Sequence, residues 1–149
     1  MSLTCRLCSS EDLVSVLDLG ASPPCESFLP ASAVDDPEPT YPLHLRLCRD
    51  CLLLQIPPLI VPAETFTDYA YYSSYSTSWV EHADRYVEQA VSDLGLGPDS
   101  FVVEVASNDG YLLQHVVKRK IRCLGIEPSV NCSEAAREKG VPTLTAFLD

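Results

Sequence analysis

Four of the seven cysteines in the sequence form two pairs with identical spacing. The first pair lies in "CRLC", residues 5–8, and the second in "CRDC", residues 48–51. Two such turns can present four thiolates to one tetrahedral zinc ion, which then cross-links segments that pack poorly alone. The sequence therefore predicts a structural zinc site whose ligands are Cys5, Cys8, Cys48 and Cys51.

Free thiols or redox pairs are the alternative interpretation of these cysteines. The gap between the pairs, residues 9–47, is longer than in a common zinc ribbon. A thioredoxin-like CxxC motif, however, needs a βαβ context that neither pair has. A catalytic zinc ion is not expected, because four protein thiolates leave no open coordination position. Cys25, Cys123 and Cys132 are expected to be ordinary thiols.

The stretch "VVEVASNDGYLLQ", residues 102–114, has the pattern of a strand, a turn and a helix. Open α/β sheets bind ligands at the carboxyl ends of such strands. The turn has one glycine, Gly110, where the dinucleotide fingerprint has three, and its acids Glu104 and Asp109 suit a ligand with a positive centre. Glu127 ends the next strand in "GIEPS", where a carboxylate can accept hydrogen bonds from ribose. Together these features suit S-adenosylmethionine, although each alone also fits a structural turn or a solvated acid.

Three regions must position these residues. Residues 1–62 are predicted to form a zinc-binding module of short strands, and residues 63–98 a Tyr/Ser-rich linker followed by an amphipathic helix. In residues 99–149 the buried strands "FVVEVAS" and "IRCLGIEPS" alternate with helices, and "VPTLTAF" could begin a third strand. This β-α-β-α-β order predicts an α/β fold with a parallel, Rossmann-like sheet, of which only the first half is present. We therefore expect a truncated domain that continues beyond Asp149.

Composition excludes several classes of partner. The chain is 46% hydrophobic and carries a net charge of −11, so most of its surface should repel nucleic acid and anionic membranes. No apolar run approaches the roughly 20 residues that span a bilayer, and the first residues lack the apolar core of a signal peptide. The expected location is the cytoplasm.

The order of these motifs resembles the zinc-containing sugar C-methyltransferases, which use S-adenosylmethionine to methylate nucleotide-linked keto-deoxysugars. The resemblance extends from Cys5 to about Ser129 and is carried by segments that include "CRLC", "SPPCESFL", "LRLCRDCLLLQ", "FTDYAYYSSYSTSW", "VEVASNDGYLL" and "GIEPS". It implies an N-terminal zinc module followed by the start of a class I methyltransferase domain.

The resemblance also implies roles for individual residues. It places Glu104, Ser107, Asn108 and Gly110 at the methionine side of the cofactor, and Glu127 and Pro128 at its ribose and adenine. A lid over cofactor and substrate would be formed by Tyr69, Tyr71, Tyr75 and Ser76. Without the resemblance these tyrosines could equally be an aromatic packing strip.

The implied reaction removes a proton next to a keto group, and the resulting enolate attacks the cofactor methyl group. The general base is unknown and is expected beyond Asp149, because His44, His82 and His115 occupy positions typical of structural or solvated histidines. The chain alone should therefore be catalytically inactive. Two alternatives remain: a zinc-stabilised binding or scaffold module without catalysis, and a related methyltransferase with another small-molecule acceptor. The sequence does not reveal the sugar, the methylated carbon or the oligomeric state.

Overall fold

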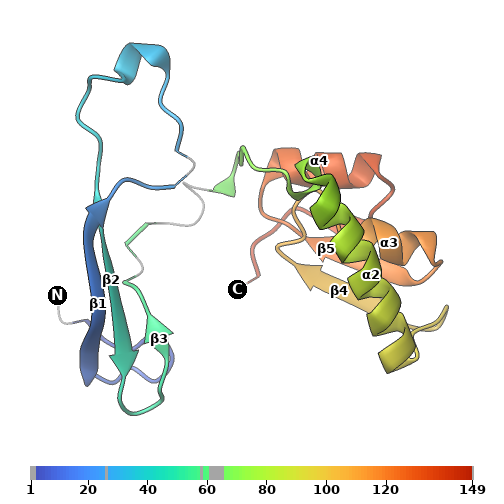
Figure 1. The fold of residues 1–149 in the computed structure, drawn as a ribbon, viewed down its shortest axis with the longest axis horizontal. Helices are drawn as coiled ribbons and strands as arrows, with labels where there is room; N and C mark the ends of the chain where they lie inside the picture. Colours follow the sequence, from blue (N-terminus) through green and yellow to red (C-terminus); the bar gives the residue numbers. More distant parts are fainter. Residues whose placement is uncertain (1–2, 26, 58, 61–65, 149) are drawn as a thin grey trace. The chain divides into compact units, whose positions relative to one another are not determined.

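The computed structural model of the chain describes residues 3–25, 27–57, 59–60 and 66–148. The chain divides into two compact units, Met1–Val61 and Pro62–Asp149. Each unit contains a three-stranded sheet (Figure 1), and the two units are described separately. No helix in the described part of the chain is long and apolar enough to cross a membrane.

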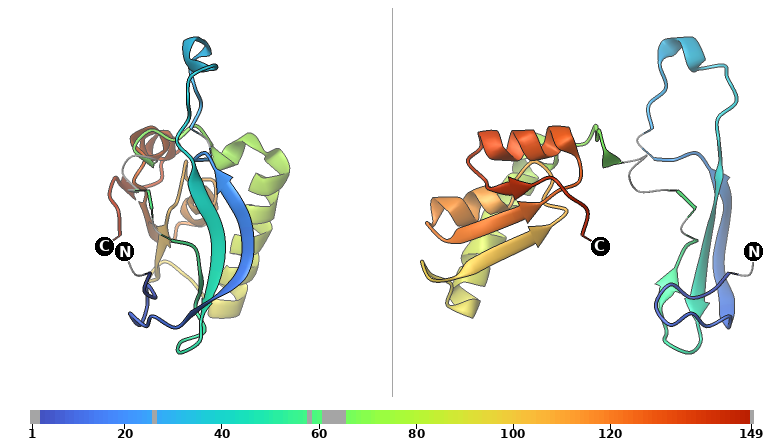
Figure 2. Two further views of the ribbon diagram at one scale, coloured as in Figure 1. Left: turned by 90° about the vertical axis from the view of Figure 1, so that its left-hand side faces the viewer. Right: turned by 180° about the vertical axis from the view of Figure 1, so that it is seen from behind.

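The N-terminal unit is an antiparallel sheet with the strand order β1-β2-β3. Its elements are β1 (Leu13–Ser22), the 3₁₀ helix η1 (Ala31–Ala33), β2 (Tyr41–Cys48) and β3 (Leu54–Gln55). Strands β1 and β2 pair from Leu13 opposite Cys48 to Ser22 opposite Tyr41, and they form the long ribbon of Figure 2. The strands predicted for this part of the chain are therefore confirmed.

This unit has almost no hydrophobic core. Among its described residues only Cys5, Cys48 and Gln55 are buried. A unit of this size cannot gain enough from apolar burial to be stable alone, and small domains of this kind are usually held by a metal or by disulfides. Two of its three buried residues, Cys5 and Cys48, are predicted zinc ligands, so the buried part of this unit is the predicted metal site.

The C-terminal unit has a parallel sheet with the order β4-β5-β6. Its elements are η2 (Ser73–Tyr75), α2 (Thr77–Leu94), β4 (Phe101–Val105), α3 (Leu113–Lys118), β5 (Arg122–Ile126), α4 (Val130–Glu138) and β6 (Thr143–Leu144). The predicted alternation of strands and helices is confirmed. Helix α2 begins at an N-cap, Ser76, whose hydroxyl accepts from the Trp79 amide, and it ends at the left-handed Gly95.

The core of this unit lies between the helices and one face of the sheet. Val87 of α2, Leu113 and Val116 of α3, and Ala136 of α4 belong to one buried cluster, together with Cys123 of β5. Val102 of β4 packs against the same cluster. Helices α2, α3 and α4 therefore contribute to a single apolar layer over the sheet.

Strand β4, predicted to be a buried strand, is covered on only one face in this chain. Phe101, Val103 and Val105 are 56%, 48% and 52% exposed. Successive side chains of a strand point to opposite faces, so these three lie opposite Val102 and the helices. The exposure arises because no described helix covers that face.

Candidate functional site

The two CxxC turns have the same backbone geometry. The Ser9 amide donates to the Cys5 carbonyl at 2.9 Å, and the Leu52 amide donates to the Cys48 carbonyl at 3.0 Å. Ser9 and Leu52, each directly after the second cysteine of its pair, have left-handed φ values of 62° and 63°. Residues other than glycine seldom adopt this conformation. Its repetition at equivalent positions indicates that both turns are shaped to aim two sulfurs toward one point.

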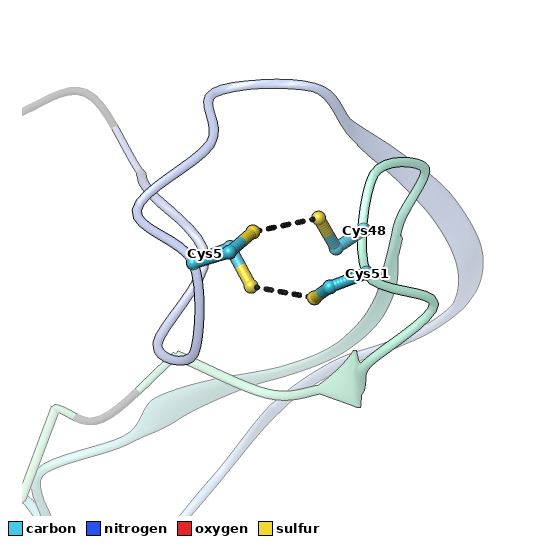
Figure 3. Close-up of side chains that lie close together, drawn as sticks. Cys5, Cys48 and Cys51 are labelled. Atoms are coloured by element: carbon cyan, nitrogen blue, oxygen red, sulfur yellow. Dashed lines mark hydrogen bonds between the residues drawn. The ribbon is translucent and has the colours of Figure 1, made fainter.

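The four predicted zinc ligands lie together. Their sulfur atoms are all within 4.8 Å of one another. The Sγ–Sγ distances are 3.5 Å between Cys5 and Cys51 and 3.6 Å between Cys8 and Cys48, and Figure 3 shows Cys48 and Cys51 directed toward Cys5. Tetrahedral Zn–S bonds of about 2.3 Å place sulfurs about 3.8 Å apart. The donor set and its spacing therefore fit one zinc ion with four protein ligands.

The sulfurs influence one another's ionisation. Burial alone would raise the pKa of Cys5, but hydrogen bonds from its own turn and from Gln55 outweigh burial and lower this pKa to about 6. For Cys8, a backbone hydrogen bond from Ser10 is outweighed by burial and by the neighbouring sulfurs, which raise its pKa to about 12. Four adjacent thiols therefore do not ionise together unaided, whereas a divalent cation deprotonates the thiols that coordinate it.

Gln55 supports the cluster, and sequence reasoning missed it. Its Nε2 donates to the Cys5 Sγ at 3.2 Å, and its Oε1 accepts from the Arg6 amide at 3.0 Å. This side chain thereby joins β3 to the first turn. The only available signal was a polar residue directly after the apolar "LLL", which is too common to identify such a role.

The turn after β4, residues 106–110, is held by the end of β5. The Ala106 and Ser107 amides both donate to the Ile126 carbonyl, at 2.8 and 3.3 Å. The Asn108 amide donates to the Glu127 Oε2 at 2.8 Å. Ala106 and Asn108 have φ values of 58° and 50°, a strained conformation that persists only where surrounding contacts fix it. Strained turns of this kind concentrate at ligand sites.

Glu127 is a buried carboxylate in this arrangement. It is 4% exposed, and its Oε1 accepts from the Ser129 amide at 2.9 Å. Each carboxylate oxygen has two acceptor sites, so hydrogen-bonding capacity remains on both oxygens. The side chain therefore joins the β4 turn to the start of α4 and can still accept from a ligand.

A cavity of about 510 Å³ opens at the carboxyl ends of the three parallel strands. It is lined by Phe66, Tyr69, Tyr71, Ser73, Val105, Ala106, Asn108, Tyr111, Ile126, Glu127, Pro128, Ala146, Phe147 and Leu148. Five of the residues proposed from sequence are in this wall: Tyr69, Tyr71, Asn108, Glu127 and Pro128. Among the described residues of the lining there is one carboxylate and no lysine or arginine. The cavity therefore matches a ligand that is neutral or cationic better than it matches a phosphate.

The other residues proposed from sequence lie outside this lining. Ser107 is fully buried, and Gly110 packs against α4, where a Cβ would lie 3.2 Å from the Ala136 Cβ. Tyr75 is 76% exposed, and Ser76 caps α2. Glu104 lies on the helix-covered side of β4, one residue before the lining begins. Their proposed roles stay predictions.

Glu104 and Glu127 are electrostatically coupled. Burial, and secondarily the charge of Glu127, raise the pKa of Glu104 to about 7. Glu104 Oε2 is buried and has no hydrogen-bond partner among the described residues. A positive charge brought close to the pair would favour the ionised form of Glu104.

The Tyr/Ser segment, defined here as residues 66–76, is attached to the wall of the cavity by two asparagines. Asn108 accepts from the Ser73 amide at 2.8 Å and donates to the Tyr71 carbonyl at 3.1 Å. Asn131 accepts from the Tyr69 amide at 3.1 Å and donates to the Tyr69 carbonyl at 2.8 Å. Asn131 was not identified from sequence, because its partner lies 62 residues away.

None of the three histidines lines this cavity. His82 stacks on Trp79, and buried His115 pairs with Asp84 at 3.1 Å. The His44 Nε2 lies 2.8 Å from the Ser15 hydroxyl in the N-terminal unit, and its Nδ1 lies 3.5 Å from an Asp18 carboxylate oxygen.

The Ser15, His44 and Asp18 group is not an activated nucleophile. The Arg46 guanidinium donates to His44 Nδ1 at 2.8 Å. Guanidinium has no acceptor, so Nδ1 must be unprotonated and the hydrogen of the neutral ring lies on Nε2. That nitrogen therefore donates to Ser15 and cannot take its proton.

Comparison with known proteins agrees with this geometry. Residues 5–66 match a family model described as "Putative zinc binding domain". The chain is 30% identical to C-methyltransferase NovU of Streptomyces niveus over 142 residues, which are 95% of this chain and 34% of that protein. The chain thus spans about a third of the length of this curated relative. The matched zinc-binding domain includes all four clustered cysteines, and both matches support the resemblance of this chain to zinc-containing C-methyltransferases.

Proposed function

We propose that the chain is the N-terminal part of an S-adenosylmethionine-dependent C-methyltransferase. Its cysteine cluster would hold one structural zinc ion, and the cavity at the carboxyl ends of β4, β5 and β6 would hold the cofactor. The observation that carries this proposal is a cavity beside a strained turn, whose described lining residues include the carboxylate Glu127 and no lysine or arginine. The arrangement suits a Rossmann-like sheet of the class I methyltransferase type, because its parallel order β4-β5-β6 places the ends of β4 and β5 side by side.

The chemistry of the wall favours this cofactor over a dinucleotide. A pyrophosphate needs free backbone amides or cationic side chains, whereas the Asn108 amide is already occupied by Glu127. Glu127 has acceptor capacity for the two ribose hydroxyls, and the pair Glu104 and Glu127 provides negative potential for a cationic sulfur. When bound, S-adenosylmethionine would supply the electrophilic methyl group.

The chain's own residues would bind and enclose the cofactor. The Tyr/Ser segment contributes Phe66, Tyr69, Tyr71 and Ser73 to the wall, so it would exclude water from one side of the ligand. None of the histidines is placed to remove a proton from an acceptor bound in this cavity. The general base is therefore proposed to lie outside the chain described here.

The acceptor is proposed to be a nucleotide-linked keto-deoxysugar. The support is the similarity to C-methyltransferase NovU and the resemblance of the motifs to the sugar C-methyltransferases. The lining residues that the structure describes offer no lysine or arginine for a diphosphate, so the nucleotide end of such a substrate would be bound by other parts of the complete protein.

A calorimetric titration of the complete protein tests the cofactor assignment. S-adenosylmethionine and S-adenosylhomocysteine differ in the charge on sulfur, so the ratio of their affinities reports the negative potential at that atom. We expect Glu104→Gln to reduce binding of S-adenosylmethionine more than binding of S-adenosylhomocysteine, and Glu127→Ala to weaken both. A wild-type protein that binds neither ligand would refute the assignment and favour a non-catalytic zinc-stabilised module. Unchanged binding by Glu127→Ala would remove the ribose role.

A further inference from the structure

A cluster of three side chains joins the Tyr/Ser segment to the turn after β4, away from the cavity lining. Lys139 directly follows α4, and its Nζ donates to Asp109 Oδ2 at 2.6 Å, to the Asp109 carbonyl at 2.8 Å and to the Ser74 hydroxyl at 2.9 Å. The Ser74 hydroxyl in turn donates to Asp109 Oδ2. One ammonium group thereby holds together three segments that are distant in sequence.

Asp109 requires this cation. Its side chain is 1% exposed, whereas the Lys139 side chain is 31% exposed. A buried carboxylate without a partner is strongly unfavourable, and removal of one partner of a buried pair leaves the full desolvation cost of the other. The expectation that Asp109 offers negative charge to a ligand is therefore replaced by a different role, since Lys139 already neutralises it.

The cluster lies directly beside the cavity wall. Ser74 follows Ser73, and Asp109 follows Asn108, and both Ser73 and Asn108 line the cavity and are hydrogen-bonded to each other. Any separation of Ser74 from Asp109 would therefore stretch the hydrogen bond between the Ser73 amide and Asn108. The Asn131 contact to Tyr69 holds the other end of the segment independently.

We propose that Lys139 is a positioning residue for cofactor binding, which holds the Tyr/Ser segment against the β4 turn and so keeps the two walls of the cavity together. This inference rests on the proposed function for the identity of the ligand. The contact between the walls is a property of the unliganded protein. In the part of the chain that the structure describes, the Lys139 ammonium donates to Ser74 and Asp109, neither of which is in the cavity lining, so its effect acts through these two residues.

The first test needs no ligand. Hydrogen exchange of the complete protein is compared for wild type, Lys139→Met, Lys139→Arg and the control Lys120→Met. Lys120 is exposed, and its side chain forms no hydrogen bond or ion pair in the described residues. We expect Lys139→Met to accelerate exchange at the Ser73 amide but not at the Tyr69 amide, with partial recovery in Lys139→Arg and no effect of Lys120→Met. Wild-type exchange in Lys139→Met, or an increase spread over the whole C-terminal unit, would overturn the proposal.

The second test measures the cofactor. Coupling energies between such sites typically change affinity by about 5- to 150-fold, so we expect at least about a fivefold weaker affinity for S-adenosylmethionine in Lys139→Met. The KM for the cofactor should rise with little change in kcat, and the double variant Lys139→Met/Asp109→Asn should recover part of the affinity because it removes the unpaired charge. Unchanged affinity in Lys139→Met, or no recovery in the double variant, would contradict positioning through Asp109. If wild-type protein does not bind S-adenosylmethionine, the proposed function fails, and the exchange result alone decides whether Lys139 holds the segment.

Discussion

Replacement of Glu104 by glutamine should remove a loss of folding stability that occurs as the pH rises. The pKa of Glu104 is raised from 4.5 to about 7 by burial and by the nearby Glu127. A raised carboxyl pKa means that the folded protein keeps its proton while the unfolded chain releases it, so stability is fully present below pH 4.5 and is lost as the pH rises to about 7. At about 1.4 kcal/mol per pKa unit, the loss amounts to at most about 3 kcal/mol. Glutamine does not titrate, so the variant should lack this loss.

The assay is denaturant unfolding followed by the fluorescence of Trp79, the only tryptophan of the chain, which lies in α2 and reports on the C-terminal unit. Stability is measured at pH 4.5 and pH 8 for wild type, Glu104→Gln and the exposed control Glu88→Gln. From pH 4.5 to pH 8, the free energy of unfolding of Glu104→Gln relative to wild type should increase by up to about 3 kcal/mol. For Glu88→Gln this difference from wild type should stay constant. Parallel pH profiles for Glu104→Gln and wild type would refute the conclusion that this carboxyl is buried in its neutral form.

Three further outcomes follow from the structure. Zinc analysis should give one zinc per chain, and Cys48→Ser should lose the metal and unfold the N-terminal unit without changing Trp79 fluorescence; a metal-free wild type with an intact N-terminal unit would contradict the metal site. Gly125→Ala should destabilise the C-terminal unit by about 1–3 kcal/mol, because a Cβ there would overlap the Ser107 hydroxyl. If calorimetry gave this variant the stability of wild type, the close contact between Gly125 and Ser107 would be contradicted. Burial lowers the pKa of His115 more than Asp84 raises it, so the free energy of unfolding should fall as the pH drops below 6.5. In a Glu104→Gln background, His115→Leu should flatten this dependence on pH, and an unchanged slope would exclude His115 as its cause.

The metal site was predictable because its information is local. Each CxxC turn sets the direction of its own two sulfurs, and two identical turns next to strands leave few other arrangements. Gln55 was not predictable, because its contact with Cys5 depends on how β3 pairs with β2. The order of strands and helices in the C-terminal unit followed from hydrophobic periodicity, but the exposure of Phe101 depends on which face the helices cover.

The cavity wall was predictable only in part. The ends of parallel strands meet at one edge of a sheet, so Asn108 and Glu127 could be expected together. The hydrogen bonds of Asn131 and Lys139 to the Tyr/Ser segment join residues more than 60 positions apart, and no local sequence pattern predicts them. The packing of Gly110 against α4 could not be predicted either, because it depends on how the helix lies over the turn.

Binding of S-adenosylmethionine in the cavity at the ends of β4 and β5 is tested most directly by one titration. Calorimetry of the complete protein with S-adenosylmethionine should show one site per chain in wild type and a markedly weaker site in Glu127→Ala, with the exposed control Glu88→Gln unchanged. No binding by wild type, or equal binding by wild type and Glu127→Ala, would contradict it.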